Sequence, residues 1–392
     1  MTNPFMIFRI KMTFPIKTHD ELIAQLKDFD PIKYAKTRNF VDGGVSRLSP
    51  YLTYGIITIP ECIAVISEKY SVKEAEKFLM ELVWKEFFVQ VQMFEWSRIT
   101  DEDFREEKTG ISKKSLLPKS LFLGSTDTPW VDDSIQELNT TGRLHNHQRM
   151  RLASRCCHRA KLDRKLCADR TYYHFLDGEL SSNHLSRQWV NSSFANKAYM
   201  MNEENLQKYR QWAIDEDLRG SYEEVSIRLF DEARVSTFWS EEDMKPTLTT
   251  NCSDFETVES CISSIQKYST IKILSPWRLH PSIIDENTVV VLDETFLDRH
   301  PWSELRTGFV KSYCDHYEIP CVYWSYEWLI KACLDQNVSV TLDERFDPVY
   351  HEIQKKFASD VELISYPYLR RNSSDLVIPK FFKYWNKAKK HI

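Results

Sequence analysis

The helix predicted over residues 72–96 carries a carboxylate, an indole and an ammonium on one face. At about 100° per residue, Glu81, Trp84 and Lys85 lie together beside an apolar stripe that is the expected core contact. This face is either a solvated Glu–Lys pair next to a half-buried indole or the wall of a cavity. In a cavity, Glu81 would supply a hydrogen bond or a proton, and Trp84 a stacking surface. Periodicity alone favours the solvated pair.

Residues 143–170 are strongly basic, with nine Lys or Arg against two Asp, in a chain of net charge −5. Arg151, Arg155 and Arg159 follow one another at a spacing of four, which predicts that they line one edge of a helix. A solvated cationic face is the alternative, but so many arginines with few acidic partners suit a phosphate backbone better. We therefore expect this edge to contact DNA phosphates.

The opposite face of the same helix mixes an amide, a guanidinium and a thioether, from Asn146, Arg149 and Met150. This set is too polar for a core unless Arg149 is paired, and Asp177 in the following loop is a candidate partner. The segment after Asp177 holds further polar and aromatic side chains: Glu179, Asn183 and Trp189. Its carboxylates form only a weak metal motif, and hydrogen bonding to the edge of a ring is equally good chemistry. We predict no metal site.

A glycine pair and two hydroxyls precede another predicted helix, in the stretch GGVSRLSP at 43–50. Flexible backbone N–H groups with hydroxyls can bind a phosphate at a helix start. The same residues can also do no more than cap the helix, which is the favoured interpretation on this stretch alone.

Helices must position all of these side chains. From Pro15 to about Trp212 the apolar spacing is helical, and Thr18 and Glu21 form a capping-box pattern at the first helix. Further helices are predicted at 59–69, 72–96, 130–140, 145–161, 167–176 and 203–214. After about residue 268 the runs TIKILS, TVVVLD, PCVYW and VELIS read as strands separated by amphipathic segments, which predicts a small parallel α/β domain. We expect domains at 14–214 and 269–392, joined by peripheral helices and a linker at 215–268.

Composition limits the class of protein. A chain of 392 residues with 42% hydrophobic and 28% charged residues is a globular protein of about two domains. The nine cysteines form no CxxC pair, so reduced thiols are expected. Arg9 and Lys11 interrupt the apolar start of the chain, and no apolar run is long enough to span a membrane. We expect a soluble, cytoplasmic monomer that does not bind membranes, nucleoid-associated if the source is bacterial.

Together these segments resemble the FAD-binding helical domain of the DNA photolyase/cryptochrome superfamily. The resemblance runs in order from Phe14 to about Tyr209, roughly half of the chain. It is carried by YAKTRNF with VSRLSPYLTYG, ELVWKEFF, WVDDSIQELNTTGRLHNHQRMRLAS, and YYHFLDGELSSNHLSRQW. The implied fold is an α-helical domain that binds FAD and UV-damaged DNA, single- or double-stranded, beside a Rossmann-like α/β domain.

The resemblance implies a role for each matching residue at the cofactor. The pyrophosphate-binding turn corresponds to Val45, Ser46, Leu48 and Ser49, with Tyr34 near the phosphates. Lys85 stands where relatives have an Arg, and Glu179 where they have an Asp that contacts the flavin ring or ribityl. Arg149 and Asp177 match the ion pair beside the isoalloxazine. Asn183 matches the residue that faces flavin N5, where Asn is typical of photolyases, Asp of plant cryptochromes and Cys of animal cryptochromes.

The resemblance also implies a pocket for a flipped-out cyclobutane pyrimidine dimer, lined by Glu81, Trp84, Asn146, Met150 and Trp189. The 6-4 photolyases place histidines at the positions of Asn146 and Met150, so the cyclobutane class is favoured. Reduced flavin excited by blue light would donate an electron that splits the dimer. Glu81 and Asn146 would stabilise the resulting anion by hydrogen bonds.

Three departures from the family pattern affect these expectations. Arg187 and Arg164 stand where relatives have the two inner tryptophans of the electron-transfer chain, so photoreduction would need other rings: Tyr172, Tyr173 or Trp212. Arg143 replaces a common Trp near the lesion pocket. ILSPWRLHPSII and IPKFFKYW resemble the opening strand and the final segment of the antenna domain, so we expect a reduced, circularly permuted antenna domain at 269–392 with no second chromophore.

The favoured function is therefore a light-driven lyase that repairs cyclobutane pyrimidine dimers. The alternatives are a cryptochrome-like FAD photoreceptor without repair activity and a light-independent nucleic-acid-binding module. A metal-dependent nuclease is disfavoured because the chain shows no cluster of carboxylates and histidines.

Overall fold

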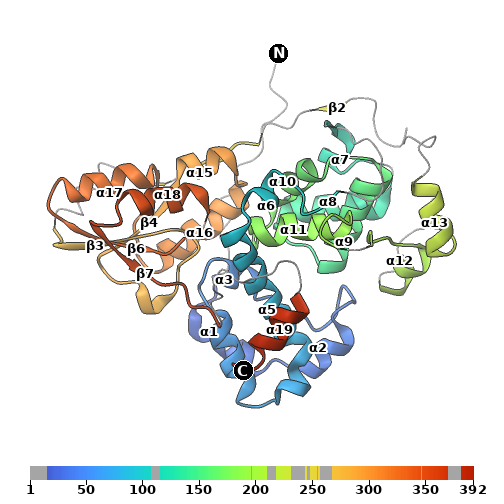
Figure 1. Cartoon of the computed structure of the whole chain (residues 1–392), viewed down its shortest axis with the longest axis horizontal. Helices are drawn as coiled ribbons and strands as arrows, with labels where there is room; N and C mark the ends of the chain where they lie inside the picture. The colour runs from blue at the N-terminus through green and yellow to red at the C-terminus, as the bar shows by residue number, and fades with distance from the viewer. Residues whose placement is uncertain are drawn as a thin grey trace.

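The computed structural model describes residues 16–106, 115–126, 128–195, 197–209, 218–230, 243–244, 248–253, 255–256, 267–345, 347–369 and 381–392. It confirms the predicted fold class, an α-helical part followed in sequence by a small parallel α/β part (Figure 1). Trp212 and the end of the helix predicted at 203–214 lie outside the described residues, as do Phe14 and residues 378–380 of IPKFFKYW.

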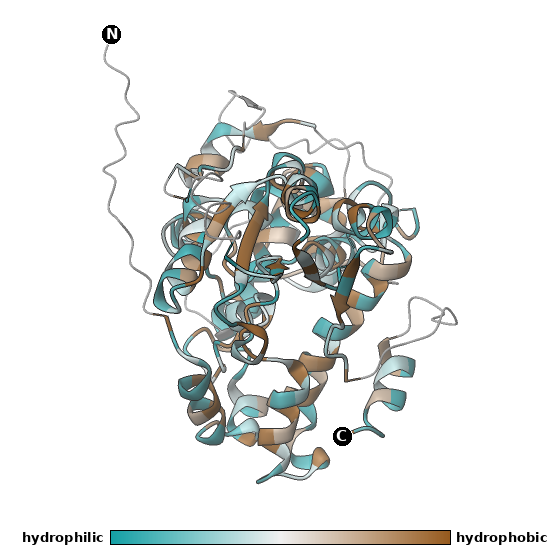
Figure 2. Cartoon of the chain, turned by 90° about the vertical axis from the view of Figure 1, so that its left-hand side faces the viewer, coloured by the Kyte–Doolittle hydropathy of each residue, from teal (hydrophilic) through white to brown (hydrophobic). Residues whose placement is uncertain are grey.

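The first helices of the chain pack on the long helix α5 (Val72–Phe94) or on one another. Thr18 and Glu21 form the predicted capping box of α1, and Ser71 with Glu74 forms another at the start of α5. The remaining helices of this group are short: α1 (His19–Lys27), α2 (Pro31–Thr37), α3 (Ser49–Thr53), α4 (Ile59–Ser67) and α6 (Ser97–Thr100). Apolar and polar residues alternate along the helices, as expected where each buries one side (Figure 2).

A second group of helices packs beside α5 and carries the basic and polar segments. It comprises α7 (Lys119–Leu123), α8 (Pro129–Thr141), α9 (Asn146–Ser154), α10 (Arg164–His174), α11 (Leu180–Val190), α12 (Glu203–Tyr209) and α13 (Tyr222–Leu229). The predicted helix 145–161 is α-helical only to Ser154 and then widens into a π-helix, η1 (Arg155–Arg159). A short antiparallel pair, β1 (Leu117–Pro118) with β2 (Asp243–Met244), lies at the edge of this group.

The α/β part holds a five-stranded parallel sheet in the order β5-β4-β3-β6-β7. The strands are β3 (Thr270–Leu274), β4 (Thr288–Asp293), β5 (Cys321–Trp324), β6 (Ser339–Asp343) and β7 (Val361–Ile364). The connecting helices are α15 (Glu294–Arg299), α16 (Glu304–His316), α17 (Tyr326–Leu334) and α18 (Pro348–Lys356). The order reverses between β3 and β6, so the carboxyl ends of these two strands flank a crevice of the kind that binds ligands in α/β folds.

The last helix, α19 (Phe381–Ala388), leaves the sheet and packs on α5 among the first helices of the chain (Figure 1). Phe381, Tyr384 and Trp385 are its buried aromatic residues. The Tyr384 hydroxyl bonds Glu86 and accepts a hydrogen bond from Gln90 at 2.8 Å. The end of the chain therefore contacts the helix that carries Glu81, Trp84 and Lys85.

Candidate cofactor and ligand site

Arg149 on α9 and Asp177 in the loop before α11 form the ion pair that the sequence suggested. Nη2 of Arg149 lies 2.9 and 2.8 Å from the two carboxylate oxygens, and Nε donates to the Leu144 carbonyl at 2.9 Å. The guanidinium carbon lies 4.0 Å from the centre of the Phe175 ring. Burial alone would raise the pKa of Asp177, but the charge and hydrogen bonds of Arg149, with a hydrogen bond from Ser49, hold this pKa below its usual value.

Lys85 is not paired with its neighbour one turn away. Its ammonium donates to Glu179 and to the Thr53 hydroxyl, both at 3.0 Å, while Glu81 pairs with Arg38, the residue directly after α2. The solvated Glu–Lys pair that periodicity favoured is therefore wrong, because tertiary partners take each charge. The Thr53 hydroxyl also donates to the Asp177 carbonyl at 3.2 Å, which joins both ion pairs into one polar network.

The turn at 43–49 connects α2 to α3 and lies against this network. Leu48 takes the N-cap position of α3 without any side-chain capping bond, so the capping interpretation of this stretch is wrong. Ser49 hydrogen-bonds to Asp177 instead. A Cβ at Gly43 would lie 2.0 Å from the Thr37 carbonyl oxygen, so only glycine fits there. The turn thus brings the Ser49 hydroxyl next to the Arg149–Asp177 pair.

Tyr34 and Asn183, two further residues assigned to the cofactor, are each held by neighbouring side chains or backbone. The ring of Tyr34 packs edge-on against Phe78 with centroids 5.5 Å apart, and burial and the nearby Glu81 raise the pKa of its hydroxyl. The Asn183 amide nitrogen donates to the Ala168 carbonyl at 2.8 Å, and its oxygen accepts from the Thr171 hydroxyl at 3.3 Å. Asn183 on α11 is therefore held in one orientation by α10.

Glu81 and Asn146, two of the residues assigned to a lesion pocket, lie near Arg38. Arg38 connects two of its walls, since its side chain bonds Glu81 and its carbonyl contacts the His145 ring at 2.9 Å, one residue before Asn146. The exposed amide of Asn146 contacts the Met150 sulfur at 3.7 Å.

The two tryptophans of the predicted pocket differ in environment. Trp84 is stacked on Phe381 of α19, with ring centroids 3.6 Å apart and planes 8° from parallel. Trp189 at the end of α11 is 37% exposed, and its ring lies 5.6 Å from that of Tyr199.

The predicted phosphate-binding edge is not on the surface. Arg151 and Arg155 are 0% and 1% exposed, and only Arg159 of the three is partly exposed. Arg151 donates to the side chain and carbonyl of Asn205 on α12. The prediction that Arg151 and Arg155 line a DNA-contacting edge is therefore wrong, because α12 covers α9 and the chain changes to a π-helix at Arg155.

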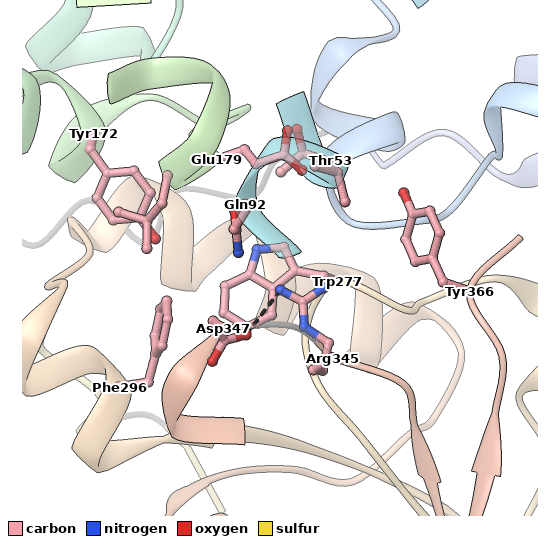
Figure 3. Close-up of a pocket in the computed structure, with 11 residues that line it drawn as sticks. Thr53, Gln92, Tyr172, Glu179, Trp277, Phe296, Arg345, Asp347 and Tyr366 are labelled. Atoms are coloured by element: carbon pink, nitrogen blue, oxygen red, sulfur yellow. Dashed lines mark ion pairs between the residues drawn. The ribbon is translucent and has the colours of Figure 1, made fainter. Parts of the chain in front are cut away.

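A small cleft lies between the helical part and the crevice at β3 and β6, and side chains from both parts line it (Figure 3). It touches only Thr53 and Glu179 of the network described above. Arg345 and Asp347 on its other side pair at 3.4 Å, and burial raises the pKa of Asp347. Sequence reasoning missed these residues, although charges directly after a buried strand are a signal of such a crevice.

The donor types of the network fit a flavin nucleotide. A guanidinium, an amide and an ammonium suit the polar edge of a flavin ring, and the hydroxyls and N–H groups of the turn suit a pyrophosphate. The described helices include none with both the length and the apolarity needed to cross a membrane.

Comparisons with known proteins agree with this fit. The family described as the FAD binding domain of DNA photolyase matches residues 78–222. A deoxyribodipyrimidine photo-lyase of Thermus thermophilus is 31% identical over 184 residues, 46% of this chain and 44% of that protein. The DASH cryptochrome of Ostreococcus tauri is 28% identical over 157 residues, 38% of this chain and 29% of that protein.

The match is partial in every case. A class III photolyase structure from Agrobacterium tumefaciens aligns with a TM-score of 0.43 at 21% identity, covering 49% of this chain and 42% of that one. The chain spans less than half the length of the curated relatives it matches. Residues 78–222 of the helical part thus match an FAD-binding domain, and FAD is the cofactor that this match indicates.

Proposed function

Because residues 78–222 match the FAD binding domain of DNA photolyase, we propose that the protein is a light-driven lyase that repairs cyclobutane pyrimidine dimers in UV-damaged DNA. One observation carries the proposal. On both α5 and α9, a residue assigned to the lesion stands next to a residue of the cofactor network: Glu81 one turn before Lys85, and Met150 directly after Arg149. Lesion and cofactor would then share a wall.

Each group has a distinct task in this proposal. Arg149, fixed by Asp177, and Asn183, fixed by α10, hold the flavin ring, while Lys85 with Glu179 holds its ribityl side. The turn at 45–49 holds the pyrophosphate. FAD bound there, reduced and excited by blue light, would lend the dimer an electron that is returned once the cyclobutane ring has split, so the reaction has no net redox change.

The lesion wall binds and polarises the dimer. The amide of Asn146 and the carboxyl group of Glu81, positioned by Arg38, hydrogen-bond the polar edges of the two bases. Trp84 and Trp189 offer ring surfaces that offset the stacking lost when the dimer leaves the duplex. In the structure Phe381 covers one face of Trp84, so a lesion that stacks on this face must displace α19.

A second candidate is an FAD photoreceptor or flavin-containing nucleic-acid-binding protein without repair activity. The Phe381–Trp84 stack and the burial of Arg151 and Arg155 favour it, because both reduce what the protein presents to DNA. The two functions differ in one measurable property, the splitting of the dimer.

The deciding experiment is anaerobic blue-light illumination of dithionite-reduced protein with an oligonucleotide that carries one thymine dimer. We expect the intact thymines to be restored under light and not in the dark. Glu81→Ala should lower the yield per photon while FAD stays bound, and Glu76→Ala, an exposed carboxylate on the same helix, is the control. Bound flavin with retained DNA and no splitting would establish the second candidate.

A redox measurement tests the flavin side. Asn183→Asp exchanges an amide for a carboxylate at the position assigned to flavin N5, and we expect it to change the stability of the flavin radical state in a redox titration. An unchanged titration would place Asn183 away from N5.

A further inference from the structure

Two imidazoles and one carboxylate meet where the helical part contacts the α/β part. The Nε2 atoms of His19 and His280 lie 3.1 and 2.9 Å from the same atom, Oε1 of Glu61. The two rings are edge-on, with centroids 4.9 Å apart. His19 begins α1, Glu61 is in the first turn of α4, and His280 precedes the short 3₁₀ helix η3 (Pro281–Ile283). Three separate elements therefore deliver one ligand atom each to one point.

The spacing of these atoms is close to that of a metal site. Zn²⁺ binds imidazole nitrogen and carboxylate oxygen at about 2.0–2.2 Å, which puts neighbouring ligands of a tetrahedral ion roughly 3.3 Å apart. The three ligand atoms all lie within 4.8 Å of one another.

The outer atoms of the ligands are held as metal ligands usually are. Oε2 of Glu61 accepts hydrogen bonds from the amide and the hydroxyl of Thr58, at 2.8 and 2.6 Å. Nδ1 of His280 lies 2.7 Å from the Ser282 hydroxyl. Such second partners orient the ligating atoms.

We propose that His19, Glu61 and His280 bind a divalent first-row transition metal ion, zinc in the first instance, with water as the fourth ligand. The ligand side chains are 22%, 31% and 12% exposed, which leaves a path for the ion and a place for the water. Imidazole ligands select zinc and its neighbours over magnesium. The ion would tie α1 and α4 to the loop before η3 and so stabilise the contact of the helical part with the α/β part. This inference does not depend on the proposed repair activity.

Binding would change the tautomer of His280. In the structure Nδ1 of His280 accepts from the Ser282 amide at 3.2 Å, which leaves the hydrogen on Nε2 to donate to Glu61. A metal on Nε2 moves this hydrogen to Nδ1, which then gives up the hydrogen bond from the Ser282 amide and donates to the Ser282 hydroxyl. Nitrogen-15 NMR of labelled histidine should show the exchange on addition of zinc.

The test is calorimetric titration of chelator-stripped full-length protein with zinc chloride, and separately with magnesium chloride. We expect one equivalent of zinc to bind and no magnesium. His19→Gln and His280→Gln each remove a ligand, and Glu61→Gln removes the charge while Gln at this position still allows the capping box of α4. Loss of a ligand should weaken binding by more than the roughly 10–100-fold typical of a second partner. His351→Gln, an exposed histidine on α18, is the matched control.

Two further measurements keep the result unambiguous. Far-UV circular dichroism and flavin content show whether each variant folds, and zinc should raise the melting temperature of the wild type but not of Glu61→Gln. Thiol alkylation before the titration should leave binding unchanged, since all described cysteines except Cys252 are buried. Equal zinc binding by the wild type and the three ligand variants, or no binding by the folded wild type, would overturn the proposal.

Discussion

Replacing Phe381 with alanine should free the indole face of Trp84 and tighten the binding of damaged DNA. Phe381 is 4% exposed, and it lies edge-on to Phe87 as well as stacked on Trp84. A pyrimidine ring and Phe381 cannot occupy the same face of Trp84. Under the proposed function the docked α19 therefore competes with the lesion.

The size of the effect follows from the burial of Phe381. Replacing a buried Phe by Ala costs about 3–5 kcal/mol. A helix of eight residues such as α19 is not stable by itself, so this cost falls mainly on its docking onto α5. If only molecules with α19 undocked bind DNA, the apparent association constant equals the intrinsic constant multiplied by the undocked fraction. Weakening the docking of α19 by 3 kcal/mol changes the docking equilibrium constant by roughly 150-fold. We expect the affinity for damaged DNA to rise about 10- to 150-fold, because the increase ends once most molecules have α19 undocked.

The assay is fluorescence anisotropy of an oligonucleotide that carries one thymine dimer, at fixed salt concentration. Phe382→Ala is the matched control, since Phe382 is on the same helix and 65% exposed. In the Trp84→Ala background the gain from Phe381→Ala should disappear, because the shared surface is gone. An unchanged or weaker affinity of Phe381→Ala, with proteolysis showing that α19 is released, would refute the assignment of this indole face to the lesion.

Three other substitutions probe the network and the corrected residues. Asp177→Asn leaves the Arg149 guanidinium without its ionic partner. Breaking a fully buried ion pair costs about 3–5 kcal/mol, and breaking this partly exposed pair costs less. We expect FAD to be retained at least about tenfold more weakly, measured as flavin absorbance per chain after dialysis. Arg151→Ala removes hydrogen bonds to Asn205 and should lower the free energy of unfolding by about 2–3 kcal/mol, yet leave the salt dependence of DNA binding unchanged; a shallower slope would restore Arg151 as a phosphate contact. Burial and a neighbouring guanidinium lower the pKa of His174 to about 2. As the pH falls, His174 therefore takes up its proton in the unfolded chain before it does so in the folded chain. The free energy of unfolding should then decrease below about pH 6.5, by up to roughly 1.4 kcal/mol per pH unit. His174→Gln should flatten this dependence in denaturant titrations, and an equal slope in the variant would assign it to other groups.

Local patterns predicted the elements well because local interactions determine them. The capping box of Thr18 and Glu21 forms as expected, and α5 begins and ends within two residues of the predicted 72–96. Strand β6 was missed, since only Val340 and Leu342 supply apolar side chains to a strand that also carries Ser and Thr. Its place in the sheet comes from pairing with β3 and β7, which periodicity does not report.

Charged residues show where sequence reasoning fails. Arg151 and Arg155 look like surface cations because their spacing is helical and acidic residues are few nearby in sequence. Their burial depends on α12, more than 45 residues later, and on the π-helix at 155–159. The pairs of Lys85 with Glu179 and of Glu81 with Arg38 also cross long stretches of chain. By contrast, the pairing of Arg149 with Asp177 was predictable, because an otherwise apolar environment requires a partner for the guanidinium.

The aromatic residues of the helical part suggest why the deciding experiment starts from chemically reduced protein. Arg187 and Arg164, at the positions of the usual inner tryptophans, are 3% and 7% exposed and cannot be oxidised. Among the rings named as substitutes, Tyr172 accepts a hydrogen bond from the indole of Trp302 at 2.9 Å. The Arg306 guanidinium lies 4.4 and 4.0 Å from the centres of these two rings. A cation this close in a buried site opposes the loss of an electron from either ring. Light alone should then reduce the oxidised flavoprotein slowly, and repair should depend on a reductant that reaches the flavin directly.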